Sequence, residues 1–372
     1  MLKGFHIQDW LQRRFHILIA RSEPAQGILV LSAGGLGDTV LFAIILPRLL
    51  ELCQDKETVT ILLRSDAAKM AFLFPPGVGL EVVDFKQYRK SLSYRRKINR
   101  RLFKANYRLV ISSDYLRHPD LDEGLVAATA TQAIAMEPRS WPKHDKALQG
   151  NRRLYGRLYD SGSEHVDKVV RWSRFVDWII GKPNPLPALQ LETDIQARQT
   201  DVPDILIQPF SAVKEKQSSP DLYQDIIQSL PPNTRIAITG TRGDLESNPE
   251  FNSLLELPNV SFDTSSFVDL VPTLKATRLV ISVDTAMMHL AVVLGTQTLC
   301  LASAAYVGEI VPYDDDVCPS NAHFIYHDMD CRGCLGACHL SPIDDKYPCV
   351  AGIKHDDVVG TVNKLYGETP QT

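Results

Sequence analysis

The sequence predicts an α/β protein built from two Rossmann-like domains, each with a parallel sheet. Apolar stretches typical of buried strands alternate with helical patterns through both halves of the 372-residue chain, as in parallel sheets covered on both faces. A chain of this length can form two domains with their own cores. A proline-rich segment, residues 181–194, separates the two alternating sets and is typical of an interdomain linker. Two such sheets would face each other across a cleft, where ligands bind in folds of this kind.

The expected elements follow the chain in order. Residues 1–26 carry short apolar runs interrupted by basic side chains, with no cleavage site, which predicts an N-terminal helical extension rather than a signal peptide. The first domain is expected over residues 27–185, with a helix from about Asp38 to Leu52 after its first strand. The second domain is expected over residues 195–355, and a final helix over residues 356–372. The expected strands are GILVLSA, TVTILLR, LEVVDF and YRLVISSD in the first domain, and DILIQPF, RIAITG, NVSFD, RLVISVD and TQTLCLAS in the second.

Charge is distributed unevenly along the chain. Residues 1–190 contain 29 Lys and Arg against 19 Asp and Glu, whereas the remainder contains 11 against 25. Basic side chains are densest from Lys86 to Arg108, where Tyr94, Ile98 and Leu102 recur at helical spacing, so we expect one amphipathic helix with a basic outer face. Such a face suits solvent, an anionic acceptor or anionic lipid. No nucleic-acid-binding motif accompanies it, and no apolar run is long enough to span a bilayer.

The first expected strand leads into a glycine-rich loop and an aspartate, in the stretch LVLSAGGLGDTVL. The loop lacks the Lys-Ser/Thr pair of a phosphate-binding Walker loop and the third glycine of a dinucleotide site. Asp38 would also repel a pyrophosphate at this helix terminus. The helix terminus instead keeps the carboxylate ionised, which suits a general base that takes a proton from a hydroxyl. Taken alone, an aspartate here is more often only a helix cap.

The second domain has polar residues after three of its expected strands. Because the carboxyl ends of parallel strands meet at one edge of a sheet, these residues are expected to converge on one site. The N-terminus of the helix in DTAMMHLAVVLG is suited to a diphosphate, and a lysine nearby would neutralise a leaving phosphate. The converging residues are Ser211, Lys214 and Lys216, then Gly240 and Asp244, then Asp284, Thr285 and His289.

Three motifs resemble those of glycosyltransferase family 9, the heptosyltransferase family, which has the GT-B fold. The family reads roughly GALGDxxL, PGAxxxxKxWPxE and DTGxxHLAxALGxPT, and this chain has GGLGDTVL, PFSAVKEKQSSPD and DTAMMHLAVVLGTQT. The resemblance covers about residues 27–311 and implies that Asp38 is the catalytic base, Lys216 binds phosphate and Asp244 contacts the nucleoside. The expected donor-binding residues are Gly37, Ser211, Lys216, Asp244, Asp284, Thr285, Ala286, Met287 and His289.

The resemblance implies an inverting, metal-independent transfer of a sugar to a hydroxyl acceptor. It implies heptose from ADP-heptose as the donor and the inner core of lipopolysaccharide as the acceptor, with the protein in the cytoplasm or peripheral at the inner membrane face. Three departures from the family pattern stand against this reading: Ala286 replaces a glycine, Ser218 replaces a tryptophan, and no arginine precedes the glycine loop. These departures leave a non-catalytic sugar-nucleotide-binding scaffold as an alternative. A protein acceptor, and a hydrolase or epimerase of the nucleotide sugar, are further alternatives.

Four of the seven cysteines lie close together near the C-terminus. Cys331, Cys334, Cys338 and Cys349 have the spacing C-x2-C-x3-C-x10-C, which is suited to a tetrahedral thiolate metal site. The branch of the family that heptosylates autotransporter proteins has a similar four-cysteine iron site, so the resemblance implies structural iron or zinc here and favours the protein acceptor. Free thiols are the alternative.

Overall fold

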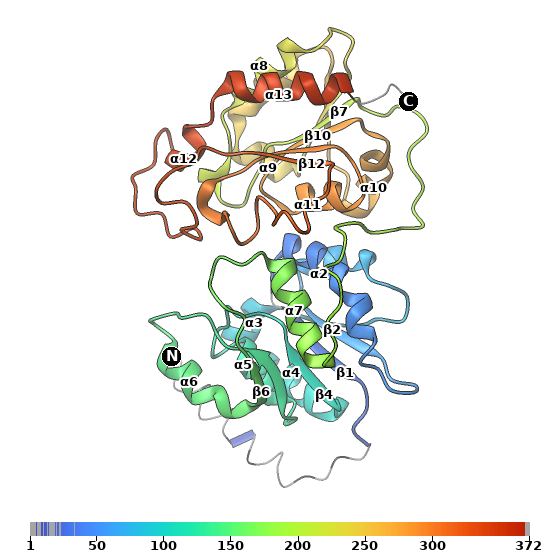
Figure 1. The fold of residues 1–372 in the computed structure, drawn as a ribbon, viewed down its shortest axis with the longest axis vertical. Coiled ribbons are helices and arrows are strands. Elements are labelled where there is room, and N and C mark those ends of the chain that lie inside the picture. The colour runs from blue at the N-terminus through green and yellow to red at the C-terminus, as the bar shows by residue number, and fades with distance from the viewer. Residues whose placement is uncertain are drawn as a thin grey trace. The chain divides into compact units, whose positions relative to one another are not determined.

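Two parallel sheets organise the chain, one in each of two units (Figure 1). The computed structural model describes residues 5, 9, 11, 12, 14, 19, 21, 24–32 and 34–368. The first unit comprises the described residues up to Glu164 together with Arg171–Pro185, and the second comprises His165–Val170 and the described residues from Leu186 onward. Most of the predicted N-terminal extension, and the last four residues of the predicted final helix, lie outside the described residues.

The sheet of the first unit has six strands in the order β3-β2-β1-β4-β5-β6. The central strand, β1, is apolar because it pairs with a strand along each edge and helices cover both of its faces. Ile28 at its start pairs with Val59 on one side and Leu109 on the other, and all residues of the strand are buried. The strands are β1 (Ile28–Ser32), β2 (Val59–Arg64), β3 (Gly79–Val83), β4 (Leu109–Ser112), β5 (Ala133–Met136) and β6 (Tyr155–Tyr159).

Helices and short 3₁₀ turns connect these strands. Helix α2 follows β1 directly after the glycine loop, and most of its residues are buried. The loop therefore joins a buried strand to a largely buried helix. The connections are α2 (Leu36–Leu50), η1 (Ala67–Leu73), α3 (Phe85–Lys90), α4 (Leu92–Ala105), α5 (Asp122–Ala128), α6 (Asp145–Asn151), η2 (Arg152–Leu154) and α7 (Lys168–Ile180).

The basic stretch predicted as one helix forms two. Ser91 has an extended backbone with φ −113° and ψ 116°, and its hydroxyl accepts the N–H of Tyr94, so it ends α3 and caps α4. A serine that competes in this way for backbone groups is typical of a helix start. The amphipathic pattern itself is confirmed, because Ile98 and Leu102 are buried while the basic side chains between them are exposed.

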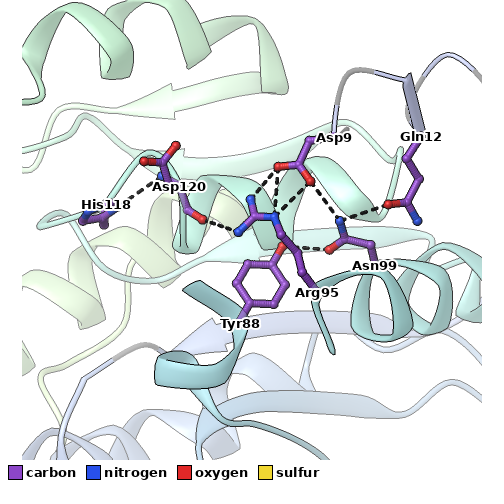
Figure 2. Close-up of polar contacts among 7 residues, drawn as sticks. All are labelled: Asp9, Gln12, Tyr88, Arg95, Asn99, His118 and Asp120. Carbon is purple, nitrogen blue, oxygen red and sulfur yellow. Dashed lines mark hydrogen bonds and ion pairs between the residues drawn. The ribbon is translucent and has the colours of Figure 1, made fainter. Parts of the chain in front are cut away.

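One arginine of the basic stretch lies inside the unit. Arg95 is 3% exposed and forms a bidentate ion pair with Asp9, at 2.9 Å from its Nε to Oδ1 (Figure 2). Its guanidinium also lies over the ring of Tyr88 and donates to the carbonyl of Asp120 at 2.8 Å. Asn99, one turn further along α4, lies 3.4 Å from Asp9 Oδ1. The inward face of α4 is therefore fixed by a carboxylate from the N-terminal part of the chain.

A second ion pair joins the starts of three strands in the first unit. Glu57 accepts from Arg108 through both oxygens, at 2.6 Å each, and from the backbone N–H groups of Gly27 and Gln54. The hydrogen bonds from Arg108 are the main reason that the pKa of Glu57 falls from 4.5 to about 2. The ionised form is therefore the one that the fold stabilises.

This pair predicts a loss of stability in acid. Because the pKa of Glu57 is lowered in the folded state, its contribution is complete above about pH 4.5 and disappears as the pH falls towards about 2. We expect Glu57→Gln to be less stable than the unchanged protein at pH 7, and the gap to close over that window. Urea unfolding of both proteins from pH 7 to pH 3 measures it. A gap that stays constant with pH would contradict the prediction.

The sheet of the second unit also has six strands, in the order β12-β11-β10-β7-β8-β9. Its two central strands pair in parallel, with Leu279 opposite Ile205. The strands are β7 (Ile205–Gln208), β8 (Ile236–Thr239), β9 (Val260–Asp263), β10 (Leu279–Val283), β11 (Thr298–Leu301) and β12 (Ala322–Ile325).

Helices α8 and α13 lie side by side on one face of this sheet (Figure 1). Tyr223 and Ile226 of α8 and Val358 and Val362 of α13 pack with the strand residues in one buried cluster. The connections of the unit are η3 (Lys214–Lys216), α8 (Pro220–Ser229), α9 (Arg242–Ser247), η4 (Pro249–Glu256), α10 (Phe267–Ala276), α11 (Ala286–Val293), η5 (Ala304–Tyr306), α12 (Pro348–Ala351) and α13 (His355–Glu368).

The predicted fold class, two Rossmann-like α/β domains with parallel sheets, is confirmed. Each of the nine expected strands is present, while β5, β6 and β12 were not predicted. Across the part of the chain that the structure describes, no helix combines the length and the apolar character needed to cross a membrane.

Candidate functional site

Each sheet has one point at which the order of its strands reverses. In the first sheet this point lies between β1 and β4, and in the second it lies between β7 and β10. The connections that leave the carboxyl ends of such a strand pair run to opposite faces of the sheet, and the crevice between them is where ligands bind in open α/β sheets. The predicted base follows β1, and the predicted phosphate-binding residues follow β7 and β10.

Asp38 lies at the third position of α2, because the helix begins at Leu36 rather than at the predicted Asp38. Its Oδ2 accepts the backbone N–H of Gly35 at 2.7 Å, so the carboxylate caps its own helix. Positive charge at the helix N-terminus favours the ionised form of this carboxylate. The cap and the predicted base are thus compatible, since a carboxylate oxygen has more than one lone pair to offer.

The glycine loop leaves room for this carboxylate. A Cβ atom at Gly34 would lie 2.4 Å from the Cβ of Asp38 and 2.5 Å from its Oδ2, closer than any real contact. The glycine is therefore required by the approach of Asp38. This arrangement supports the interpretation that the loop serves a carboxylate rather than a phosphate.

A cavity of about 800 Å³ opens at the same edge of the first sheet. Its carboxylates are engaged locally, because Asp66 binds Arg64 at 2.8 Å and Asp84 caps α3. Asp66 is the main cause of the raised pKa of Arg64, and the charge of Asp38 contributes further, so Asp38 lies within electrostatic range of the cavity wall. The basic lining residues are Arg64, Lys86, Arg89 and Lys90.

In the second unit the structure brings two predicted residues together. Lys216 Nζ lies 2.7 Å from Asp284 Oδ2 and donates to the main-chain carbonyl of Asp284 at 3.0 Å. Both side chains are buried, at 10% and 6% exposed. The ring of Tyr306 lies 4.8 Å from the same nitrogen.

Thr285 is the N-cap residue of α11, beside this pair. Its hydroxyl donates to Gln208 Oε1 at 3.0 Å, and Gln208 is itself held by a hydrogen bond of its amide nitrogen to the carbonyl of Phe210. The first backbone N–H groups of a helix have no partner within the helix and attract anions. Ala286 occupies the first helical position, and Met287 is buried behind it.

His289 is 3% exposed, and its Nδ1 lies 2.6 Å from the hydroxyl of Tyr313. Burial raises the pKa of Tyr313 well above its ordinary value, so the phenol stays protonated. The imidazole is thus fixed inside the unit, one turn from Thr285. The Tyr313 hydroxyl is therefore the hydrogen-bond partner of the imidazole at Nδ1.

The remaining predicted residues are half-buried. Ser211 lies in the loop after β7, where its hydroxyl accepts the N–H of Val213. Asp244 closes a capping box with Thr241 in α9. Gly240 faces Phe210, whose ring lies 2.6 Å from where a Cβ would be, so this glycine is required by packing. Gly37 lies in the first turn of α2, in the first unit, whereas the other predicted donor-binding residues lie in the second.

The four cysteines of the cysteine-rich segment, residues 331–349, line one small cavity with Met329 and Tyr347. Among the described residues, however, no three His, Cys, Asp or Glu side chains are arranged so that they could hold a metal ion. The four residues line one cavity, but their arrangement does not support the predicted four-cysteine iron or zinc site. Those cysteines are Cys331, Cys334, Cys338 and Cys349.

Three residues at these sites were not predicted: Gln208, Tyr306 and Arg64. Gln208 is the last residue of β7 and Arg64 is the last residue of β2, so their positions at strand ends were a signal in the sequence. Tyr306 lies five residues after β11, and nothing in its sequence context relates it to Lys216. Strand-end position alone would have found the first two.

Solved structures share this fold. An ADP-heptose lipopolysaccharide heptosyltransferase II of E. coli aligns over 92% of this chain and 99% of its own, with a TM-score of 0.67 and 14% identity. A glycosyltransferase family 9 protein of Veillonella parvula aligns over 92% and 98%, with a TM-score of 0.67 and 16% identity. The iron-containing dodecameric glycosyltransferase TibC of enterotoxigenic E. coli aligns over 94% and 78%, with a TM-score of 0.53 and 13% identity.

The predicted GT-B fold is confirmed by these structures, and so is the structural resemblance to glycosyltransferase family 9. No protein-family model and no curated protein sequence matches the chain.

Proposed function

We propose that this protein is an inverting glycosyltransferase that moves heptose from ADP-heptose to a hydroxyl of an anionic acceptor. One observation carries the proposal: a carboxylate and a buried lysine beside a helix N-terminus each lie at the reversal point of their own sheet. The fold is that of a heptosyltransferase and of a family 9 glycosyltransferase. The motifs at both reversal points are those of the same family.

The proposed reaction is a single displacement. Asp38 takes the proton of the acceptor hydroxyl while its oxygen forms a bond to the anomeric carbon, and the bond from that carbon to the diphosphate oxygen breaks. The electron pair leaves with the nucleoside diphosphate, whose negative charge Lys216 and the N-terminus of α11 stabilise. These groups supply the positive charge that the departing diphosphate needs, which is the basis for proposing a metal-independent reaction.

The proposed donor rests on two lines of support. The first is the signature around Asp284 and Thr285, which resembles that of the heptosyltransferase family. The second is the fold, which is shared with a heptosyltransferase solved with ADP-2-deoxy-2-fluoro heptose, at a TM-score of 0.64 and 13% identity. Asp244 is proposed to contact the ribose or base from its position after β8.

The proposed acceptor is the inner core of lipopolysaccharide. The support is the basic cavity of the first unit, which is lined by Lys86, Arg89 and Lys90 and by the paired side chains of Arg64 and Asp66. A phosphate or carboxylate on the acceptor would pair with these cations. A protein acceptor is the second candidate, and the resemblance of the four-cysteine spacing to that of the autotransporter-heptosylating branch of the family is what favours it.

The test is calorimetric titration of the purified protein with ADP, UDP and GDP, followed by ADP-heptose. We expect ADP and ADP-heptose to bind at least about tenfold more tightly than UDP and GDP, a difference of about 1.4 kcal/mol. Preference for UDP or GDP would overturn the heptose assignment and leave the GT-B mechanism. If none of the nucleotides binds, the proposed glycosyltransferase function fails.

The first unit also has a surface suited to anionic lipid. Helices α3 and α4 carry nine cations, and residues 85–105 contain no acidic side chain. Two of these cations are engaged, the buried Arg95 by Asp9 and the exposed Arg101 by Glu81, and the other seven are exposed. Leu92, 41% exposed, is the first residue of α4. The seven residues, here called the basic face, are Lys86, Arg89, Lys90, Arg96, Lys97, Arg100 and Lys104.

We propose that the basic face docks on an anionic membrane surface, where each cation contributes about 1 kcal/mol. Arg100→Gln with Lys104→Gln should weaken co-sedimentation with phosphatidylglycerol vesicles by about 10- to 30-fold. Lys354→Gln with Lys364→Gln, exposed residues of the second unit, is the matched control and should not. Equal binding by both double variants, or equal binding to uncharged phosphatidylcholine vesicles, would contradict the proposal.

A further inference from the structure

Two short 3₁₀ turns hold the phosphate-binding candidate Lys216. Lys216 itself ends η3, after β7, and Tyr306 ends η5, after β11. The Tyr306 ring lies 4.8 Å from Lys216 Nζ, and burial is the main cause of the raised pKa of its phenol. A cation over the face of a buried aromatic ring is attracted to it, and more strongly the less water surrounds the pair. Tyr306 thus restrains the side chain that the proposed function assigns to the donor phosphate.

Both turns are also bound to the cysteine-rich segment. The backbone N–H groups of Gly333 and Leu335 donate to the carbonyls of Ala304 and Ala305, the two residues before Tyr306, at 2.8 and 2.7 Å. At the other end of the segment, the N–H of Tyr347 donates to the carbonyl of Glu215, the residue before Lys216, at 2.9 Å.

The segment also reaches Tyr306 directly. Gly336 has φ +82°, and a Cβ there would lie 2.9 Å from the Tyr306 hydroxyl. The hydroxyl therefore lies against the backbone of the segment, two residues beyond Cys334. One aromatic side chain has its ring against Lys216 and its hydroxyl against the cysteine-rich segment. Ala304 and Ala305 meanwhile line the pocket of the four cysteines.

We propose that Tyr306 is a positioning residue for Lys216, and that through it the cysteine-rich segment sets the affinity of the second unit for a nucleoside diphosphate. The inference rests on the proposed function, since it concerns the same lysine. In this proposal the cysteine-rich segment influences donor binding through its packing and hydrogen bonds alone. Displacing the segment would move Tyr306, and with it the side chain of Lys216.

The test is the dissociation constant for ADP of three variants, measured by calorimetry. Tyr306→Leu removes the ring and should weaken ADP binding by about 3- to 30-fold. Tyr306→Phe retains the ring and should bind within about twofold of the unchanged protein. Gly336→Ala, 30 residues away in sequence, should also weaken binding, because its new methyl group meets the Tyr306 hydroxyl.

A double-variant cycle separates this route from general damage. In the Tyr306→Phe background the hydroxyl is absent, so the effect of Gly336→Ala on ADP binding should largely disappear, whereas the backbone strain at φ +82° remains in both backgrounds. The unfolding midpoint of each variant and the KM for acceptor provide readouts that should not follow the change in ADP affinity.

The outcomes are distinct. If Tyr306→Leu binds ADP as the unchanged protein does, Tyr306 does not position Lys216. If Gly336→Ala weakens binding equally in both backgrounds, the segment does not act through Tyr306. If the unchanged protein does not bind ADP, the proposed function fails and this inference fails with it.

Discussion

Replacing Asp38 with Asn is expected to lower turnover by about 10²- to 10⁴-fold, the usual contribution of a positioned general base. The amide oxygen of Asn can still accept the N–H of Gly35, which Asp38 accepts at 2.7 Å. The helix cap therefore survives, and only the capacity to take a proton is lost. Turnover is measured as the release of ADP from ADP-heptose, and the dissociation constant for ADP is determined in parallel. We expect that constant to change by no more than about twofold, because the proposed diphosphate site belongs to the second unit.

Asp269→Asn is the matched control for this experiment. Asp269 also occupies the first turn of its helix, α10, where it interacts with the cap residue Ser266, but the proposed reaction gives it no part. Turnover of this variant should equal that of the unchanged protein. An Asp38→Asn protein with full turnover would reduce Asp38 to a cap, and a parallel loss of ADP affinity would point to a structural defect instead.

Lys216→Met is expected to destabilise the protein by about 3–5 kcal/mol, in addition to weakening ADP binding. The change leaves the Asp284 carboxylate, 6% exposed, without its cation, and an unpaired buried charge is far more costly than an absent pair. Urea unfolding followed by circular dichroism measures the loss. Adding Asp284→Asn to Lys216→Met removes the unpaired charge and should restore a large part of the stability.

The same 3₁₀ turn provides the control. Lys214 lies two residues before Lys216, has a side chain that is 56% exposed, and pairs with Glu250 at 3.5 Å. Lys214→Met should change the free energy of unfolding by no more than about 1 kcal/mol, as is usual for an exposed ion pair. A loss of similar size in both variants would show that the buried pair has no special role in stability.

The fold was largely predictable because burial and periodicity are local properties of the sequence. The strands β1, β2 and β10 each contain four apolar residues, which is what a strand covered on both faces requires. Two of the strands that escaped prediction lack this signal, because β6 contains Gly and Arg and β12 contains His. The third, β5, is apolar, but two of its four residues are Ala, which is depleted in strands. Their partners in the sheet, rather than their own composition, make them strands.

The candidate site was predictable only in part, for the same physical reason. A strand, glycines and a helix start identify Asp38 from neighbouring residues alone. The pair of Lys216 and Asp284 joins residues 68 apart in sequence, and depends on β7 and β10 being adjacent in the sheet. Tyr306 comes from a third strand end. The break at Ser91 was missed because a single capping hydrogen bond outweighed an otherwise continuous helical pattern.

The buried contact between Asp9 and Arg95 has a consequence for the divergence of this protein. A guanidinium that is 3% exposed cannot tolerate the loss of its only carboxylate partner in Figure 2, so a neutral residue at position 9 selects against arginine at position 95. The two positions should therefore be substituted together among descendants of this sequence. Lineages that lose the acidic residue should carry an apolar or uncharged polar residue at position 95, while the exposed cations of α4 vary independently.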